Sequence, residues 1–166
     1  MKKLLWICLL CVSACGFSPL YKTQNGKTTD LTARIQIAPI ANYDGYLMEN
    51  YLSDALNPDK IGGQKQYELT VSLNAPTISE QNIQDDNFSS RERMTLTAKY
   101  RLINKTTEHV LVDSTTSATG AYNIATEPYA TWMAQKKTKE NLIKMLSERI
   151  TIHVISFVKK EAEYEG

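Results

Sequence analysis

The amino-acid sequence predicts a small α/β protein, a two-layer sandwich with the element order β-α-β-β-β-α. Three observations support this fold class. Several segments alternate strictly between apolar and polar residues, as half-buried strands do. Two stretches carry apolar residues at helical spacing, and each element has one apolar face to bury. The length of 166 residues fits a single domain.

The start of the chain is typical of a bacterial lipoprotein leader. Lys2 and Lys3 precede an apolar run over residues 4–12, which is shorter than the roughly 20 residues that span a bilayer. Residues 12–15 (VSAC) then fit a lipobox. We therefore predict a signal peptide over residues 1–14 and a covalent lipid, S-diacylglycerol and N-acyl, on Cys15. Two or more acyl chains anchor a protein stably in a membrane.

The residues around Cys15 refine this prediction. Gly16 follows it, and the absence of Asp there favours the outer membrane under the usual sorting rule. Cys8 and Cys11 have the spacing of a redox or metal motif, but we interpret them as apolar leader residues. An alternative is an ordinary secretory leader that leaves Cys15 as a free thiol. No cysteine follows Cys15, so the mature domain forms no internal disulfide.

The charge balance argues against a nucleic-acid-binding protein. The full chain has 19 Lys and Arg and 18 Asp and Glu. Removing residues 1–14 deletes Lys2 and Lys3, which leaves 17 basic against 18 acidic residues and a net charge near −1. A general nucleic-acid binder would need a clear basic excess.

The mature chain is predicted to begin with a tether, a strand and a helix. Residues 15–32 show little periodicity, so we interpret them as the lipidated N-terminus and tether, with the single domain over residues 33–166. A short strand over residues 33–40 ends near a proline. A helix over residues 43–56 follows. Asn42 and Asp44 are candidates for its N-cap.

Three strands are predicted in the middle of the domain, and each alternates in hydropathy. They are expected over residues 66–75, 91–103 and 108–122. Pro76 interrupts the first strand, and residues 77–82 can continue its pairing beyond a bend. Residues 104–107 form the turn of a hairpin between the last two strands.

A long helix over residues 127–160 is predicted to end the domain. Thr126 is its candidate N-cap, and Pro128 fits its first turn. Residues 150–158 are β-branched and have the propensity of a strand. The helix-forming run over residues 138–149 favours a continuous helix instead.

The search for catalytic chemistry predicts a protein that is not an enzyme. His109 and His153 are interpreted as core or boundary residues rather than as ligands or bases. The sequence contains no metal-ligand spacing, Gly-rich phosphate loop or nucleophile elbow. We expect no metal and no cofactor besides the lipid on Cys15.

The outward face of the strand over residues 91–103 carries a row of basic side chains. They are Arg91, Arg93, Lys99 and Arg101. One interpretation is a solvated strand whose charges protect it from pairing with other chains. The other is a surface that binds an anion or a partner, because guanidinium groups grip phosphate and carboxylate.

Short motifs in a fixed order resemble the LPS-assembly lipoproteins, the LptE (formerly RlpB) family, in its shorter alphaproteobacterial form. The motif most specific to that family is the start at residues 15–21 (CGFSPLY). The others are residues 35–40 (IQIAPI), 56–58 (LNP), 67–71 (YELTV), 96–102 (LTAKYRL), 121–124 (AYNI) and 128–131 (PYAT). The resemblance covers nearly the whole mature chain.

The resemblance implies two helices on one face of a four-stranded, mostly antiparallel sheet. It also implies a partner, the outer-membrane β-barrel LptD, whose lumen the lipoprotein enters as a plug, one copy per barrel. The complex inserts lipopolysaccharide (LPS) into the outer leaflet, and LPS itself is a candidate ligand. The expected location is the outer membrane, on its periplasmic side and in the barrel lumen.

Candidate contacts to LPS phosphates or to the partner are Arg91, Arg93, Lys136 and Lys137, because phosphates attract Arg and Lys. Two other functions stay open. The first is a membrane-anchored accessory lipoprotein of another envelope or lipid-transport complex. The second is a lipid or cell-wall hydrolase.

Overall fold

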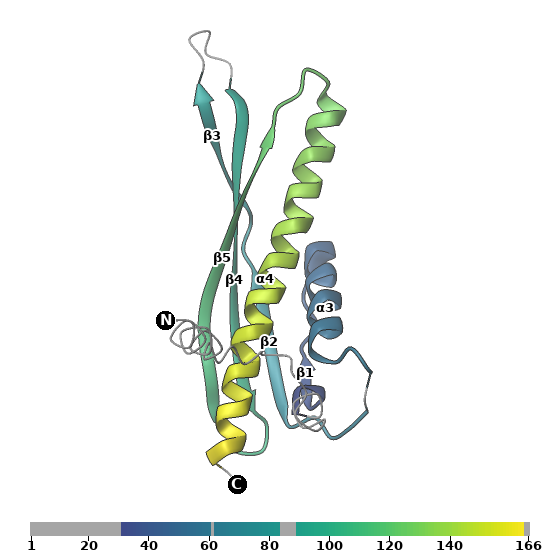
Figure 1. Ribbon diagram of the computed structural model, residues 1–166, viewed down its shortest axis with the longest axis vertical. Helices are drawn as coiled ribbons and strands as arrows, with labels where there is room; N and C mark the ends of the chain where they lie inside the picture. The colour runs from purple at the N-terminus through teal and green to yellow at the C-terminus, as the bar shows by residue number, and fades with distance from the viewer. Residues whose placement is uncertain (1–30, 61, 84–88, 165–166) are drawn as a thin grey trace, which may run out of the picture.

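The protein is a sheet with two helices on one of its faces, as the computed structural model shows (Figure 1). The structure describes residues 31–60, 62–83 and 89–164. The elements in chain order are β1 (Ile35–Ile37), α3 (Asn42–Leu56), β2 (Tyr67–Leu73), β3 (Thr77–Ile83), β4 (Ser89–Asn104), β5 (Val110–Asn123) and α4 (Pro128–Tyr164). Residues 31–33 are helical as well. The predicted signal peptide, Cys15 and residues 16–30 of the tether lie outside the described residues.

Strand β4 is the centre of the sheet. Strand β5 pairs with it in antiparallel register from Val110 to Asn123. Strands β2 and β3 share the other side of β4 end to end, and both pairings are antiparallel. Strand β1 extends the sheet next to β2, and this is the one parallel pairing in the described part of the chain. The mostly antiparallel sheet of the prediction is therefore confirmed.

The predicted number of strands was wrong, because the sheet has five strands and not four. The predicted strand over residues 66–75 ends at Leu73, and a separate strand, β3, begins at Thr77. Pro76 lies between them, and a proline has no N–H to donate to a sheet. Residues 77–83 continue along the same side of β4 beyond this bend.

Both helices lie where the sequence predicts them, but α3 is not capped as predicted. Helix α4 runs without a break through residues 150–158, so the β-branched residues there do not form a strand. At α3, the N-cap is Ala41 without a side-chain hydrogen bond, so the predicted caps were wrong. Asn42 has a φ of 70°, a conformation that asparagine tolerates better than most residues. The carboxylate of Asp44 instead lies 2.8 Å from the Lys139 ammonium.

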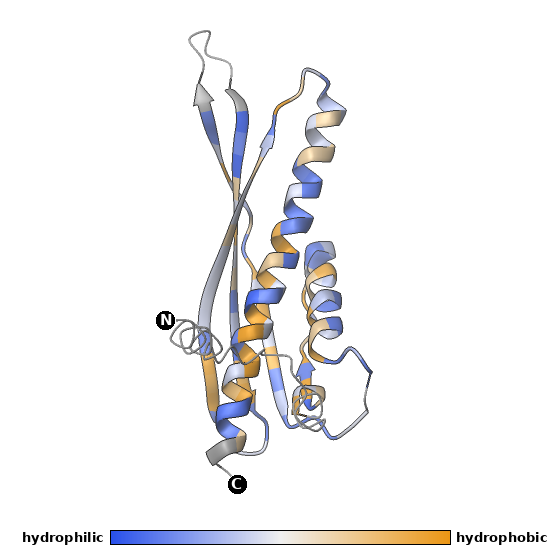
Figure 2. Cartoon of the chain, viewed as in Figure 1, coloured by the Kyte–Doolittle hydropathy of each residue, from blue (hydrophilic) through white to orange (hydrophobic). Residues whose placement is uncertain are grey.

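The core lies between the helices and the inner face of the sheet. Alternate residues of β4 are buried there, namely Met94, Leu96, Ala98, Tyr100 and Leu102. Helix α3 buries Met48, Leu52 and Leu56. Helix α4 buries Leu142, Ile143, Leu146, Ile150, Val154, Ile155 and Val158. Figure 2 shows that the hydrophobic residues of α4 gather where it crosses the sheet.

A hydrogen bond between side chains joins β5 to β4 shortly before the start of α4. The buried Tyr122 hydroxyl donates to the Glu92 carboxylate, which lies opposite it in the register. Burial raises the pKa of Tyr122 to about 12, and the hydrogen bond and the negative charge of Glu92 add to the rise. The folded state therefore favours the neutral phenol.

A matched pair of substitutions tests the end of α4. Ile150 is fully buried, whereas Ile152 is 47% exposed. We expect Ile150→Ala to lower the free energy of unfolding by about 2–5 kcal/mol, and Ile152→Ala to change it by roughly 0.5 kcal/mol or less. Urea unfolding measures both. Equal losses would contradict the helix, because residues two apart share a face only in a strand.

The Tyr122 hydroxyl provides a test at alkaline pH. Its folded pKa is raised, so its contribution to stability is complete below pH 10 and is lost as the pH rises towards 12. We expect ultraviolet difference titration of the native protein to show one tyrosine ionising near pH 12 that is missing in Tyr122→Phe. Tyr129→Phe, at a 71% exposed site, is the control and should leave that step in place. A Glu92→Gln variant that left the pKa of Tyr122 unchanged would contradict the role of the carboxylate.

Candidate functional site

The described residues offer several surfaces on which a ligand or partner could bind. In the part of the chain that the structure describes, no group of three or more His, Cys, Asp or Glu side chains is arranged to hold a metal ion. No helix in that same part is both long and apolar enough to cross a membrane. Three surface features remain as candidates: a polar pocket, the outer face of the sheet, and a groove between the helices.

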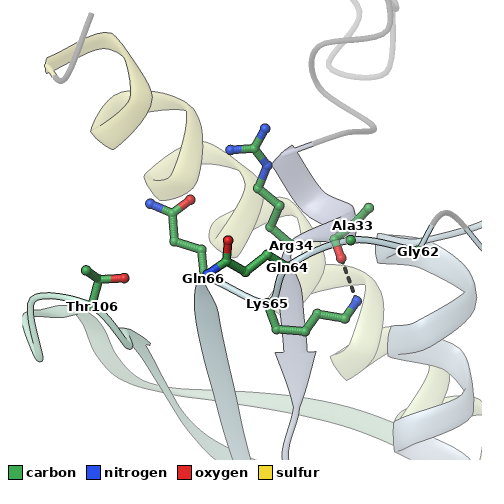
Figure 3. A pocket seen from close by; sticks show the side chains of 8 residues that line it. Ala33, Arg34, Gly62, Gln64, Lys65, Gln66 and Thr106 are labelled. Carbon is green, nitrogen blue, oxygen red and sulfur yellow. Dashed lines mark hydrogen bonds between the residues drawn. The ribbon is translucent and has the colours of Figure 1, made fainter.

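The polar pocket lies where the loop after α3 returns to the sheet (Figure 3). It has a volume of about 540 Å³ and is lined by Ala33, Arg34, Gly62, Gly63, Gln64, Lys65, Gln66 and Thr106. At its edge the Lys65 ammonium donates to the carbonyl oxygen of Ala33 at 2.6 Å (Figure 3). The lysine therefore ties the loop to the segment before β1, and we assign its role to the fold.

The outer face of the sheet is polar over the described strands. Both α3 and α4 lie on the opposite face, so the outer side chains of β4 and β5 meet no described helix (Figure 1). Its basic residues on β4 are Arg91, Arg93, Lys99 and Arg101, all exposed. Hydroxyl side chains surround them, namely Thr70, Ser72, Thr95, Thr97, Thr115, Ser117 and Thr119.

Some of this outer face is internally paired. The Lys99 ammonium lies 3.7 Å from the Asp113 carboxylate, with both side chains about half exposed. The hydroxyls of Thr95 and Thr119 share a hydrogen bond of 3.1 Å between neighbouring strands. Exposed ion pairs of this kind contribute little to stability. The face is therefore polar, with some of its side chains paired to one another.

The four candidate contact residues do not form one site. Arg91 and Arg93 project from the outer face of the sheet, because Glu92 and Met94 point inward. Lys136 and Lys137 belong to α4, which covers the inner face. The sheet thus separates two arginines from two lysines. Their role in binding stays a prediction. If all four bind, they do so on two separate surfaces of the protein.

The two lysines differ in their surroundings. The Lys136 ammonium lies over the ring of Trp132, 5.6 Å from its centroid, in a cation–π contact. The Lys137 ammonium lies 3.9 Å from the Glu140 carboxylate one turn along the helix. Lys136 therefore stacks on an aromatic ring, whereas Lys137 is held in an ion pair.

The third feature is a groove between the start of α3 and the first half of α4. It has a volume of about 280 Å³ and is lined by Tyr43, Asp44, Pro76, Met94, Trp132, Gln135, Lys136, Lys139 and Glu140. We call it the aromatic groove. The sequence analysis missed it, because Tyr43 and Trp132 look like ordinary exposed positions until the helices are placed side by side.

Two contacts hold the rim of the aromatic groove. The Lys139–Asp44 ion pair, at 2.8 Å, joins the first turn of α3 to α4. Gly45, in the same turn, allows a close approach to the preceding segment, because an added Cβ would lie 2.7 Å from the carbonyl oxygen of Ile40. The position of Tyr43 at the rim follows from these contacts.

The two histidines lie apart from these surfaces. His153 is half-buried, shares a hydrogen bond with the Tyr100 hydroxyl, and packs edge-on against Phe157. This environment confirms the interpretation of a boundary residue. His109 is exposed after the β4–β5 turn, so its placement in the core or at its boundary was wrong.

Comparison with known proteins finds a relative of similar length. No protein-family model matches the sequence. The chain is 26% identical over 159 residues to the uncharacterized protein RP188 of Rickettsia prowazekii (strain Madrid E), covering 94% of this chain and 98% of that protein.

Solved structures share the fold at low sequence identity. A Caulobacter crescentus CB15 chain, provisionally named a lipoprotein, superimposes with a TM-score of 0.64 at 19% identity, over 81% of this chain and 97% of that one. Rare lipoprotein B from Shewanella oneidensis gives a TM-score of 0.58 at 10% identity, over 79% and 100%. An uncharacterized lipoprotein B from Nitrosomonas europaea gives 0.54 at 12% identity, over 78% and 85%. The fold of this chain is therefore one that several bacterial lipoproteins have.

Proposed function

We propose that this chain is an outer-membrane lipoprotein that plugs an LptD-type β-barrel and supports its assembly, one copy per barrel. In this role it belongs to the translocon that inserts LPS into the outer leaflet. The support comes from the lipobox at Cys15, from the ordered motifs that resemble LptE, and from the fold shared with rare lipoprotein B.

The observation that carries the proposal is the polar outer face of the sheet. A protein that enters a polar, water-filled lumen needs a surface of hydroxyl and charged groups. The outer sides of β4 and β5 supply such a surface without a covering helix among the described residues.

The lipid on Cys15 would hold the plug at the membrane. Residues 16–30 could span up to about 50 Å when extended, at about 3.3 Å per residue. That length lets the domain reach into a barrel while its acyl chains remain in the bilayer. The lipid at one end of the tether would hold the chain in the bilayer. The polar face at the other end would hold the domain in the barrel.

LPS contact is a separate part of the proposal. Phosphate groups favour Arg and Lys, and the structure offers them as two pairs, Arg91 with Arg93 and Lys136 with Lys137. Because the sheet lies between the pairs, one LPS head group bound at one pair would leave the other pair free. The pairs are therefore to be tested separately.

Co-purification tests the barrel partner. With a C-terminal tag and outer membranes extracted in mild detergent, we expect a large β-barrel to co-purify in about equal amount. The measurement is quantitative mass spectrometry of the eluate, with the Cys15→Ala variant as the control that should lose membrane attachment. Recovery of the lipoprotein with an inner-membrane transporter would favour the alternative of an accessory lipoprotein in another envelope complex. Recovery of the lipoprotein alone would contradict the barrel partner.

Paired substitutions test LPS contact. Each charge-assisted contact is worth about 1.5–3 kcal/mol, so removing a pair that binds LPS should weaken binding by roughly tenfold or more. We would compare Arg91→Ala/Arg93→Ala with Lys136→Ala/Lys137→Ala in the detergent-solubilised lipoprotein, using labelled LPS. Lys144→Ala/Lys160→Ala removes the same charge from exposed sites on α4 and is the control. Unchanged binding in both pairs would remove these residues as LPS contacts.

A further inference from the structure

Strand β5 forms one edge of the sheet along its whole length. It has 14 residues, and among the described residues it pairs with β4 alone. Its backbone groups on the side away from β4 meet no other described strand. A row of free N–H and C=O groups of this kind is a template for another extended chain.

The edge of β5 has few of the features by which proteins prevent strand addition. Those features are a short strand, charged side chains, proline and bulges. Strand β1 is protected by its length of 3 residues, and β3 carries Glu80. In contrast, β5 contains no proline, and Asp113 is its one charged residue. The shift in its register with β4 lies close to its start, so residues 114–123 form an uncharged and regular edge.

Two contacts show which residues of β5 direct their backbone groups outward. The Arg149 guanidinium, on α4, donates to the carbonyl oxygen of Ser117. The hydroxyls of Thr95 and Thr119 lie 3.1 Å apart, which fits the close side chains of a pair whose backbone groups do not bond each other. Because outward and inward residues alternate along a strand, Thr115, Ser117 and Thr119 point their N–H and C=O groups away from β4. Arg149 thus takes the place of a donor from an added strand.

Helix α4 provides an apolar ledge beside this edge. The helix packs mainly on β5. Gly120 allows this close approach, because an added Cβ would lie 3.1 Å from the Cγ2 atom of Thr138. Met145, Arg149 and Ile152 have the spacing i, i+4 and i+7, so they share one flank of α4. Since Arg149 reaches the edge, this flank lies next to it, with Met145 39% and Ile152 47% exposed.

We propose that the free edge of β5 binds an extended segment of the partner β-barrel protein, which adds a strand to the sheet. The proposal rests on the proposed function, because it takes the barrel protein as the partner. Alternating donors and acceptors along an edge are matched by the backbone of an extended polypeptide, whereas a lipid or a helix has no such row to offer. The side chains of the segment would alternate as well, apolar towards Met145 and Ile152, and polar beside Thr115 and Thr119.

The source of the segment follows from two further arguments. The wall strands of a closed barrel have no free edge, so the segment belongs to a loop or to a soluble part of the barrel protein. A second copy of this chain fits the edge less well. Ser117 lies near the middle of β5, so symmetric pairing along the whole strand would bring the Arg149 side chains of both copies together. Like charges at close range oppose such a pair.

Hydrogen exchange tests the edge directly. We would compare the isolated, detergent-solubilised lipoprotein with its co-purified barrel complex, using mass spectrometry that resolves single amides. In the isolated protein the outward amides of Thr115, Ser117 and Thr119 should exchange fast, whereas those of Thr116 and Ala118, bonded to β4, should exchange slowly. In the complex we expect the outward amides to slow by roughly tenfold or more, with the inward amides unchanged.

A matched pair of substitutions tests the same contact. Thr119→Pro removes one outward N–H and places a ring against an incoming strand, while the bonds to β4 remain. We expect it to lower the barrel recovered in co-purification by about tenfold. Thr119→Ala keeps the N–H and should leave recovery unchanged. Thr115→Pro with Thr115→Ala repeats the comparison at a second site, and circular dichroism checks that each variant folds.

The outcomes separate the two proposals. Recovery of the barrel with outward amides that exchange as fast as in the isolated protein would overturn the edge proposal and leave the proposed function intact. Equal recovery with both proline variants and their alanine controls would do the same. Outward amides already protected in the isolated lipoprotein, together with a dimer by light scattering, would make a second copy the occupant and overturn the barrel segment. A co-purification without any barrel would overturn the proposed function, and the edge proposal with it.

Discussion

The packing of α4 along one face of β4 and β5 is the contact on which the rest of the structure depends. Seven apolar side chains of α4, beginning at Leu142, bury themselves against the inner residues of these strands. Because a core of this kind needs a helix on one side of the sheet only, the other side is free to be polar. The same contact fixes where α3 sits, since α3 packs on α4 as well as on β1 and β2.

This packing explains why the molecule has two unlike surfaces. Along β4, residues of odd and even number face opposite sides, so Arg91 and Arg93 are outside and Met94 is inside. Helix α3 is too short to cover all of the inner side, which leaves an apolar opening beside Trp132. The outer face therefore results from the alternation of side chains along the strands. The aromatic groove results from the different lengths of α3 and α4.

Much of this fold was predictable from local patterns, and the rest was not, for physical reasons. Alternation located β2, β4 and β5, and the run before residue 150 outweighed β-branched propensity in α4. The pairing of residues 77–82 beyond the bend at Pro76 was allowed for, but local alternation did not show that they form a fifth strand, β3, separate from β2. The cap at α3 was missed since Asp44 bonds to Lys139, a residue far along the chain. The separation of Arg91 from Lys136, and the groove itself, depend on how helices pack on the sheet.

The polar outer face and the aromatic groove would restrict the orientation of a bound partner to different degrees. A polar sheet face can meet a wet lumen wall through many weak contacts, which allow several orientations with similar energy. An apolar groove with charged side chains at its rim accepts few orientations of a bound group, since both shape and charge must match. In this chain the Lys139–Asp44 ion pair and the close approach at Gly45 hold the rim of the aromatic groove in place.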